Sequence, residues 1–323
     1  MAAVTEVAPA PPAGYEFPLW RRLARKRSTR VALILCGLLI LLAVAGPYLT
    51  PYSPDVGGPD ALAGPGGSHW MGTDQFGRDV LSRLLAGARI SVFIGIGAVA
   101  IGMVPGSLLG MIAGLRGGSW LDSTIMRVMD VILAFPVLVL AAVMSGLTVG
   151  QSVRFGPVKV NQVVIVLLVI GLVLVPVFAR VARAQVLAAV QEEYMVAAKV
   201  CGTRFRALLL RHLLPNIQAP LLIQAAFSLS IAIVAEAAIS FLGLGVQPPQ
   251  ASWGNMLGDA QQELLLGAWW LLVFPTAAIA AATVGFNLLG DGLREALDPR
   301  AAAGRLGAQP PPTAASGDVR PRT

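Results

Sequence analysis

The sequence predicts an all-α transmembrane fold with six membrane-spanning helices, and three observations support this prediction. Of the 323 residues, 56% are hydrophobic and only 13% are charged, against about 25% charged in an average soluble domain. Six apolar segments alternate with polar loops. Of the 24 lysines and arginines, 19 fall in loops and tails that would share one side of the membrane. That excess marks the cytoplasmic side, so the net charge of +7 indicates topology and not nucleic-acid binding.

The first element is residues 31–49, an uncharged run that follows a basic cytoplasmic tail, residues 1–30. Nineteen residues are enough to cross a hydrocarbon core of about 30 Å. A cleaved signal peptide is the alternative, because Ala43, Val44 and Ala45 have the small-x-small pattern of a cleavage site. Five further apolar segments favour a retained first transmembrane helix.

Residues 50–89 form the next element, an extracytoplasmic loop that ends in an amphipathic helix. Asp74 with Arg78, and Asp79 with Arg83, have the i,i+4 spacing that stabilises a helix. Apolar residues at 80, 81, 84 and 85 would give that helix a face suited to the membrane interface. The alternative is a solvated helix held by its own charge pairs.

The second span, residues 90–115, contains glycines at a strict spacing of four: Gly102, Gly106, Gly110 and Gly114. Such a stripe lets another helix backbone pack closely, although a flexible helix facing lipid would also tolerate it. Pro105 is expected to kink this helix.

Four more spans complete a core that covers residues 90–291, before a cytoplasmic tail, 292–323. We expect them at about 125–149, 160–179 and 217–241, with the last ending near Leu289. Asp130 and Glu236 lie inside the third and fifth spans, and intramembrane carboxylates usually face a cavity or a partner. They therefore predict a translocation pathway or gate, or else hydrogen bonds between helices. Trp269 and Trp270 are expected at the membrane interface.

Between the fourth and fifth spans lies a charged loop, residues 191–216, which we expect to be a helix, a turn and a second helix. Gly202 suits a helix C-cap, because glycine adopts the left-handed conformation without strain. Pro215 should end that segment, with a new element from Asn216. Small side chains before Gly202 would let a partner approach closely.

This loop resembles the cytoplasmic coupling loop of permease subunits in ABC importers, whose pattern is Glu-Ala-Ala, three residues, Gly, nine residues, Ile-x-Leu-Pro. Ala197, Ala198, Gly202, Leu214 and Pro215 match it, whereas Val196 and His212 replace its Glu and Ile. The strings GTDQFGRDVLSRLLAGARIS, SFLGLGVQPPQASWGNML and FNLLGDGLREALDPR resemble the C-type permeases of dipeptide and oligopeptide (peptide/nickel) importers. The resemblance spans about residues 68–300.

The resemblance implies a type I importer permease fold and a subunit of an ATP-driven peptide importer in the cell membrane, forming half of the translocation pathway. Contacts with the ATPase would come from Glu193, Tyr194, Ala197, Ala198, Lys199, Gly202, His212, Leu214 and Pro215. The implied partners are a second permease subunit, two ATPase subunits (or one fused ATPase chain), an extracytoplasmic peptide-binding protein and membrane lipids. We expect no cofactor on this chain, with ATP and Mg²⁺ held by the ATPase subunits, because the sequence contains no GxxxxGK[ST] phosphate loop.

Three alternatives stay open at this point. Related permeases carry nickel or other small solutes. A proton-coupled secondary transporter could use Asp130 and Glu236 as carriers. An intramembrane enzyme is disfavoured, because His69 and His212, the only histidines, are expected on opposite sides of the membrane and cannot form a triad or a metal site together.

Overall fold

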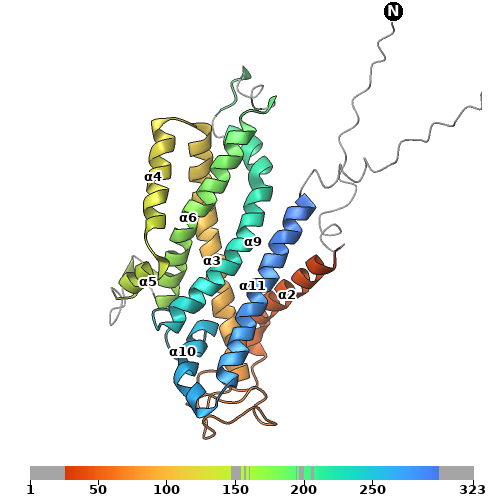
Figure 1. Cartoon of the computed structure of the whole chain (residues 1–323), viewed down its shortest axis with the longest axis vertical. Coiled ribbons are helices and arrows are strands. Elements are labelled where there is room, and N and C mark those ends of the chain that lie inside the picture. Colours follow the sequence, from red (N-terminus) through yellow and green to blue (C-terminus); the bar gives the residue numbers. More distant parts are fainter. Residues whose placement is uncertain are drawn as a thin grey trace, which may run out of the picture.

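The computed structural model describes residues 26–146, 154–155, 158–159, 161–193, 195, 200–204 and 207–297. Its α-helices are α2 (Arg27–Ala45), α3 (Val80–Leu115), α4 (Trp120–Ala134), α5 (Val137–Gly146), α6 (Gln162–Ala189), α9 (Leu214–Phe241), α10 (Trp253–Glu263) and α11 (Trp270–Leu297). Short helical turns are η1 (Gly46–Tyr48), η2 (Leu208–Leu213) and η3 (Leu264–Leu266). A two-residue antiparallel ladder pairs β1 (Arg154–Phe155) with β2 (Val158–Lys159). The long helices run up and down along one axis (Figure 1).

Five of the predicted spans are helices long and apolar enough to cross a membrane: α2 with η1, α3, α6, α9 and α11. The third predicted span is instead the pair α4 and α5, bent by 76° at a short break. Phe135, in the break, is extended with ψ 119°, because the following proline disfavours the helical conformation. Pro105 lies inside an uninterrupted α3. The prediction of an all-α bundle of membrane-spanning helices is confirmed, but its third span is broken and not straight.

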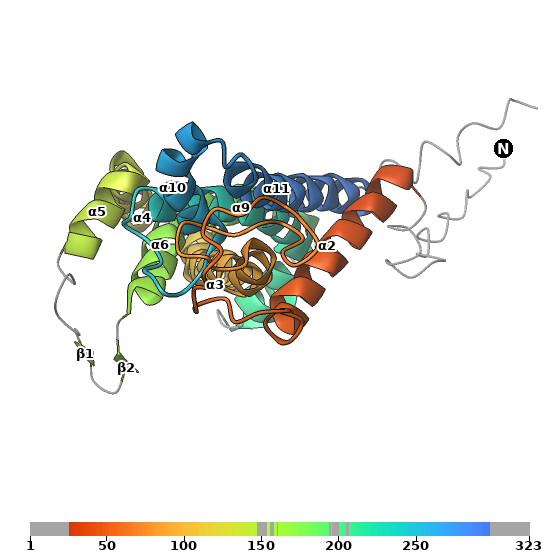
Figure 2. The same cartoon turned by 90° about the horizontal axis from the view of Figure 1, so that it is seen from below.

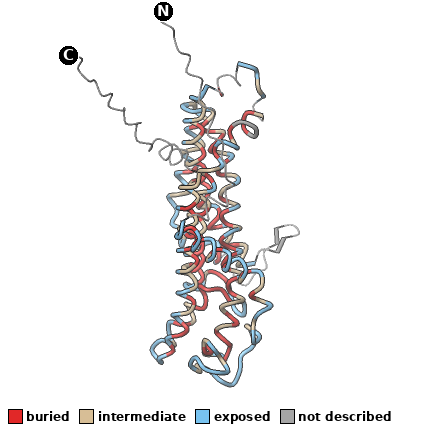
Figure 3. The backbone as a smooth tube through the Cα atoms, turned by 90° about the vertical axis from the view of Figure 1, so that its right-hand side faces the viewer, coloured by how far each residue is buried: buried red, intermediate tan, exposed pale blue. Residues whose placement is uncertain are grey.

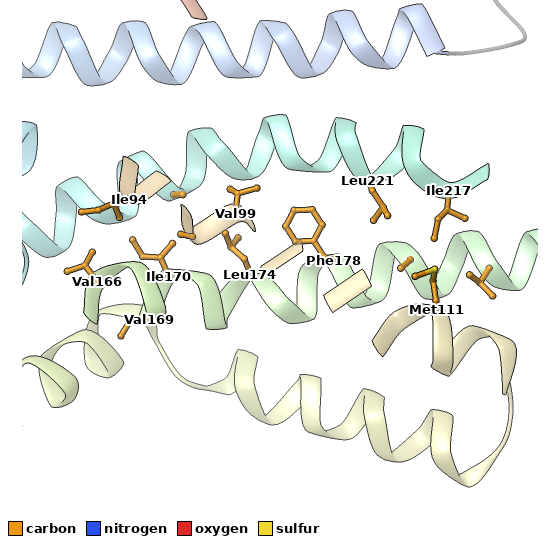
Figure 4. Close-up of a cluster of buried hydrophobic side chains, with 14 of the residues drawn as sticks. Ile94, Val99, Met111, Val166, Val169, Ile170, Leu174, Phe178, Ile217 and Leu221 are labelled. Carbon is orange, nitrogen blue, oxygen red and sulfur yellow. The ribbon is translucent and has the colours of Figure 1, made fainter. Parts of the chain in front are cut away.

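The core lies between α3, α6 and α9, with α3 in the middle when the bundle is viewed along its axis (Figure 2). Buried residues follow the length of the bundle (Figure 3). Figure 4 shows this contact, in which the central cluster includes Ile94 and Met111 from α3, Leu174 and Phe178 from α6, and Ile217 from α9. On the other side, α2 packs against α11, and α11 packs against α9.

The helix predicted just before the second span is not separate from it, because α3 starts at Val80 and runs without a break to Leu115. Asp79 is its N-cap and accepts a hydrogen bond from the backbone N–H of Ser82 at 2.8 Å. The predicted pair of Asp79 with Arg83 is therefore wrong. The predicted pair of Asp74 with Arg78 does form, at 2.6 Å, in the turn that precedes the helix.

The end of the bundle opposite the 191–216 loop, called here the α10 end, is covered by protein. Ser252 and Asn255 form a capping box that starts α10. Trp253 is fully buried and donates from Nε1 to the carbonyl of Leu84 at 3.1 Å, which holds α10 against α3. Trp270 is also buried and donates to the carbonyl of Thr73 at 3.1 Å. Trp270 was predicted to lie at the membrane interface. In the structure, the 50–79 loop folds over its ring and buries it.

Candidate functional site

The segment between α6 and α9 is anchored in the protein core at both of its ends. Met195 on one side, and Leu208 and Leu213 on the other, are buried and belong to the central hydrophobic cluster. Between them, Val200 is 83% exposed. Residues 200–204 therefore form an exposed turn, called here the tip, and the buried residues on either side of it, called here the base, hold it to the core.

Gly202 forms the exposed turn of this tip. Its φ is +69°, and no atom of the described residues lies within 4 Å of the position that a Cβ would take. Glu193 is exposed before the turn. Pro215 lies in the first turn of α9, and the π-helical η2 leads directly into that turn, with the N–H of Leu214 donating to the carbonyl of Leu209. The helix therefore continues through Pro215, and the predicted break there, with a new element from Asn216, is wrong.

Leu214, the first residue of α9, is partly buried and packs against the central hydrophobic cluster. The other residues predicted to couple the loop to an ATPase cannot be placed in the same way. Tyr194, Ala197, Ala198 and Lys199 lie outside the described residues. His212 lies in η2, and its side chain is outside the described part of the structure.

Two carboxylate–arginine pairs join α4 to α6. Asp122 is buried and accepts from Nε and Nη2 of Arg183 at 2.6 and 2.7 Å. Asp130, the predicted pathway residue, accepts from Nη2 of Arg180 at 2.6 Å, and these two side chains are 62% and 52% exposed. The buried pair was not predicted, because its partners lie 61 residues apart and each was assigned to a different loop. An acid and a base that flank two successive apolar segments are the sequence signal that could have identified it.

Glu236 is fully buried where α3, α9 and the start of α10 meet. Its carboxylate accepts hydrogen bonds from the hydroxyls of Ser91 at 2.9 Å and Ser240 at 2.8 Å. Of the two roles left open by the sequence, the contacts match a hydrogen-bonded link between helices.

The two serines also connect this carboxylate to the backbone of the α10 end. The N–H of Trp253 donates to the Ser91 oxygen at 3.3 Å, and that of Val246 donates to the Ser240 oxygen at 3.2 Å. Each hydroxyl can therefore accept from a backbone N–H while it donates to Glu236. Asp130 makes its contact with α6, so the structure gives the two predicted pathway carboxylates separate surroundings.

The four glycines of α3 face α6 at close range. A Cβ at Gly102 would lie 2.5 Å from the Cβ of Leu174, and one at Gly106 would lie 2.5 Å from the carbonyl oxygen of Val175. At Gly114 it would meet the Cβ of Val186 at 2.7 Å, and at Gly110 it would meet the carbonyl oxygen of Ala179. The contact is therefore made inside this chain, between α3 and α6.

A second charged cluster lies at the α10 end and was not predicted as a unit. Arg83 is fully buried, with Nε 3.6 Å from Asp74 and Nη2 3.5 Å from Asp259. Arg78 lies 3.5 Å from the same oxygen of Asp259. Burial raises the pKa of Asp259, while Arg83 and Arg78 oppose that shift.

Comparison with known proteins identifies the class to which this fold belongs. Residues 106–303 match the family described as binding-protein-dependent transport system inner membrane component. Residues 19–65 match the N-terminal TM domain of oligopeptide transport permease C. The chain therefore belongs to the family of inner membrane components of binding-protein-dependent transport systems, as a multi-pass permease.

Three similar proteins within this family are all named as dipeptide or di/tripeptide transport permeases. The chain is 39% identical over 282 residues to the dipeptide transport system permease protein DppC of Alkalihalophilus pseudofirmus, covering 87% of this chain and 88% of that protein. It is 38% identical to the di/tripeptide transport system permease protein DppC of Pseudomonas aeruginosa, covering 88% and 93%. It is 37% identical to the dipeptide transport system permease protein DppC of Bacillus subtilis, covering 90% and 87%. The predicted resemblance to C-type permeases is confirmed.

Proposed function

We propose that this chain is the C-type permease subunit of an ATP-driven importer for dipeptides or oligopeptides. It forms half of the translocation pathway and is driven by ATPase subunits that contact the 191–216 loop. The observation that carries the proposal is the exposed tip on a buried base between α6 and α9. A displacement of this tip would be transmitted to both α6 and α9. Met195, Leu208 and Leu213, on either side of the tip, are packed in the core that α6 and α9 share.

The pathway is expected along the face of α4 and α6 that carries Asp130 and Arg180. An ion pair more than half exposed within membrane-spanning helices is costly in contact with lipid. Water in a pathway, or a second permease subunit, would satisfy these charges. The α4–α5 break supports the same assignment, because irregular backbone at membrane depth is tolerated where it lines a cavity or is buried in protein.

The partners follow from the class. A second permease subunit would complete the pathway, two ATPase subunits or one fused ATPase chain would bind ATP and Mg²⁺, and an extracytoplasmic binding protein would deliver the solute. This chain then has no catalytic step and no cofactor of its own. Both termini and the 191–216 loop would be cytoplasmic, as the basic residues indicate.

The peptide substrate rests on the names of the relatives. Nickel or another small solute is the alternative within the family, and competition for uptake by dipeptides, oligopeptides and Ni²⁺ separates them. The proton-coupled carrier is less well supported, because Glu236 is enclosed by hydroxyl donors and Asp130 is paired with Arg180.

The test compares Gly202→Val with Gly118→Val in the assembled complex in proteoliposomes. Both glycines have a left-handed φ, +69° and +78°, and open space around the Cβ position, so the two changes impose the same backbone strain. Only Gly202 lies at the tip of the 191–216 loop. We expect Gly202→Val to abolish the stimulation of ATP hydrolysis by loaded binding protein, and Gly118→Val to retain it. Ala198→Trp, on the same loop, should act like Gly202→Val.

Equal effects of the two glycine variants would contradict the coupling role of the loop. Uptake that persists without ATPase subunits and stops on addition of a proton ionophore would contradict the importer as a whole.

A further inference from the structure

A cavity of about 530 Å³ opens at the α10 end, outside the membrane-spanning helices. It lies between the 50–79 loop and the segment that leads into α10; both cover this end of the bundle (Figure 2). The first contributes Asp55, Gln75, Phe76 and Arg78 to its walls, and the second contributes Pro248, Pro249 and, from α10, Asp259. None of these residues belongs to the 191–216 loop or to the α4–α6 face.

Arg78 is the cationic side chain among the residues that line the cavity, and it is already engaged with other groups. Arg78 donates from Nε to Asp74 at 2.6 Å, lies 3.5 Å from Asp259 through Nη2, and stacks over the ring of Phe76 with its Cζ 4.7 Å from the centroid.

Acceptors, by contrast, remain available. The side-chain oxygen of Gln75 is buried and has no hydrogen-bond partner among the described residues. Asp55 is exposed, and within the same part of the chain no ion pair involves it. The cavity therefore offers oxygens to a ligand that brings N–H groups and a positive charge.

The surface around the cavity carries carboxylates and an apolar rim. Of the six carboxylates in residues 46–79 and 242–269, Asp74 and Asp79 are buried, whereas Asp55 and Asp60 are exposed and Asp259 and Glu263 are half-buried. Phe76 and Val56 are 60% and 67% exposed beside Asp55. A large basic partner fits such a surface, because complementary charge steers association and buried aromatic and arginine contacts dominate binding energy at protein interfaces.

We propose that this cavity receives a lysine or arginine side chain of the extracytoplasmic binding protein when it docks on the α10 end. The inference rests on the proposed function, which supplies that partner. The alkyl stem of the side chain would lie along Phe76 and the two prolines, while its charged group would reach Asp55 and the Gln75 oxygen. Asp259, at the inner wall, would gain a third cationic neighbour.

The wall that carries the prolines is held in place before any partner arrives. Asn255 donates from Nδ2 to the carbonyls of Val246 at 3.2 Å and Gln250 at 2.8 Å, and the N–H of Val246 donates to Ser240. A preformed wall reduces the ordering cost of binding.

The experiment measures the affinity of the assembled complex, in nanodiscs, for the binding protein of the same system at low and high salt. Asp55→Lys should weaken binding about tenfold or more and reduce its dependence on salt. Gln75→Leu should weaken it without changing the salt dependence. Asp60→Lys is the matched control, because Asp60 is an exposed carboxylate of the same loop that does not line the cavity. Basal ATP hydrolysis without binding protein should be unchanged in all three.

Equal losses of affinity in Asp55→Lys and Asp60→Lys would overturn the proposal, since the surface charge alone would then account for them. A changed KM for the transported solute with unchanged affinity for the binding protein would also overturn it, by making the cavity a solute subsite. Failure of the unmodified complex to bind or respond to its binding protein would contradict the proposed function instead.

Discussion

At the scale of single residues, the buried polar groups are arranged so that each charge has a specific partner. Glu236 accepts hydrogen bonds from Ser91 and Ser240, and Asp122 accepts two from Arg183. A buried acceptor that loses such partners has no water to replace them. These residues are therefore expected to govern stability, and the exposed Asp130–Arg180 pair to govern transport.

Replacing Glu236 tests the first of these expectations. Glu236→Leu removes the acceptor shared by the serine hydroxyls, and we expect a loss of about 2–4 kcal/mol of stability, measured as a lower thermal midpoint of the purified protein. Glu236→Gln keeps one acceptor oxygen and should cost less, with ATPase docking intact. Glu263→Gln is the control, because Glu263 lies on α10 and its carboxylate makes no hydrogen bond or ion pair with the described residues. A Leu variant as stable as the control would show that the hydrogen bonds contribute nothing.

The two α4–α6 ion pairs offer a matched comparison, because each has a nitrogen–oxygen distance of 2.6 Å. Asp122 is almost fully buried, so Asp122→Asn should destabilise the fold by about 3 kcal/mol. Asp130 is exposed, so Asp130→Asn should change stability by less than about 1 kcal/mol while reducing uptake. Thermal unfolding in detergent and uptake in proteoliposomes give the two readouts. Equal thermal shifts would contradict the difference in burial, and exchanging the charges at positions 122 and 183 should restore stability.

At the scale of elements, the contact of α3 with α6 depends on the absence of side chains at four positions. The glycines bring the two backbones so close that even a methyl group would overlap atoms of α6. This close approach favours packing between helices within the membrane, where burying apolar surface gives no driving force.

We therefore expect Gly106→Leu or Gly110→Leu to disrupt the bundle itself and, as a consequence, its assembly with other subunits. Even Gly106→Ala places its Cβ 2.5 Å from a backbone oxygen. Gly37→Leu in α2 is the control, because no atom lies within 4 Å of that position. Yield and thermal stability of the purified chain are the measurements. Normal values for Gly106→Leu would contradict the importance of this contact.

At the scale of the whole molecule, the alternation of helices gives the protein two distinct ends. One carries the 191–216 loop and the α3–α4 turn, and the other carries α10 and the 50–79 loop (Figure 1). The distribution of lysine and arginine predicts that the first end is cytoplasmic.

Cysteine labelling in intact cells tests this orientation. Cys201 is exposed at the 191–216 loop, whereas Cys36 is buried, so the unmodified chain already contains a probe of the first end. A membrane-impermeant maleimide should label Cys201 only after the cells are opened. Ser68→Cys, in a Cys201→Ser background, should be labelled from outside, because Ser68 is exposed at the α10 end. The opposite pattern would reverse the predicted topology.

The sequence by itself determined the class of fold, the order of the membrane-spanning segments and the resemblance to C-type permeases. These are properties of contiguous stretches, since hydropathy, charge between apolar runs and short motifs are all local. For the same reason the expected ends of elements were imprecise: α3 extends ten residues before its predicted start at 90, and α6 ten residues beyond its predicted end at 179.

Only the tertiary structure decided which residues meet across those segments. Asp122 and Arg183 are 61 residues apart, and Ser91 and Glu236 are 145 apart, so no local pattern links them. The pairing of Arg83 with Asp74 and Asp259, where the sequence suggested Asp79, depends on how the 50–79 loop folds over α10. Burial decides whether a charge is structural or accessible, and it is set by the packing of all the helices together.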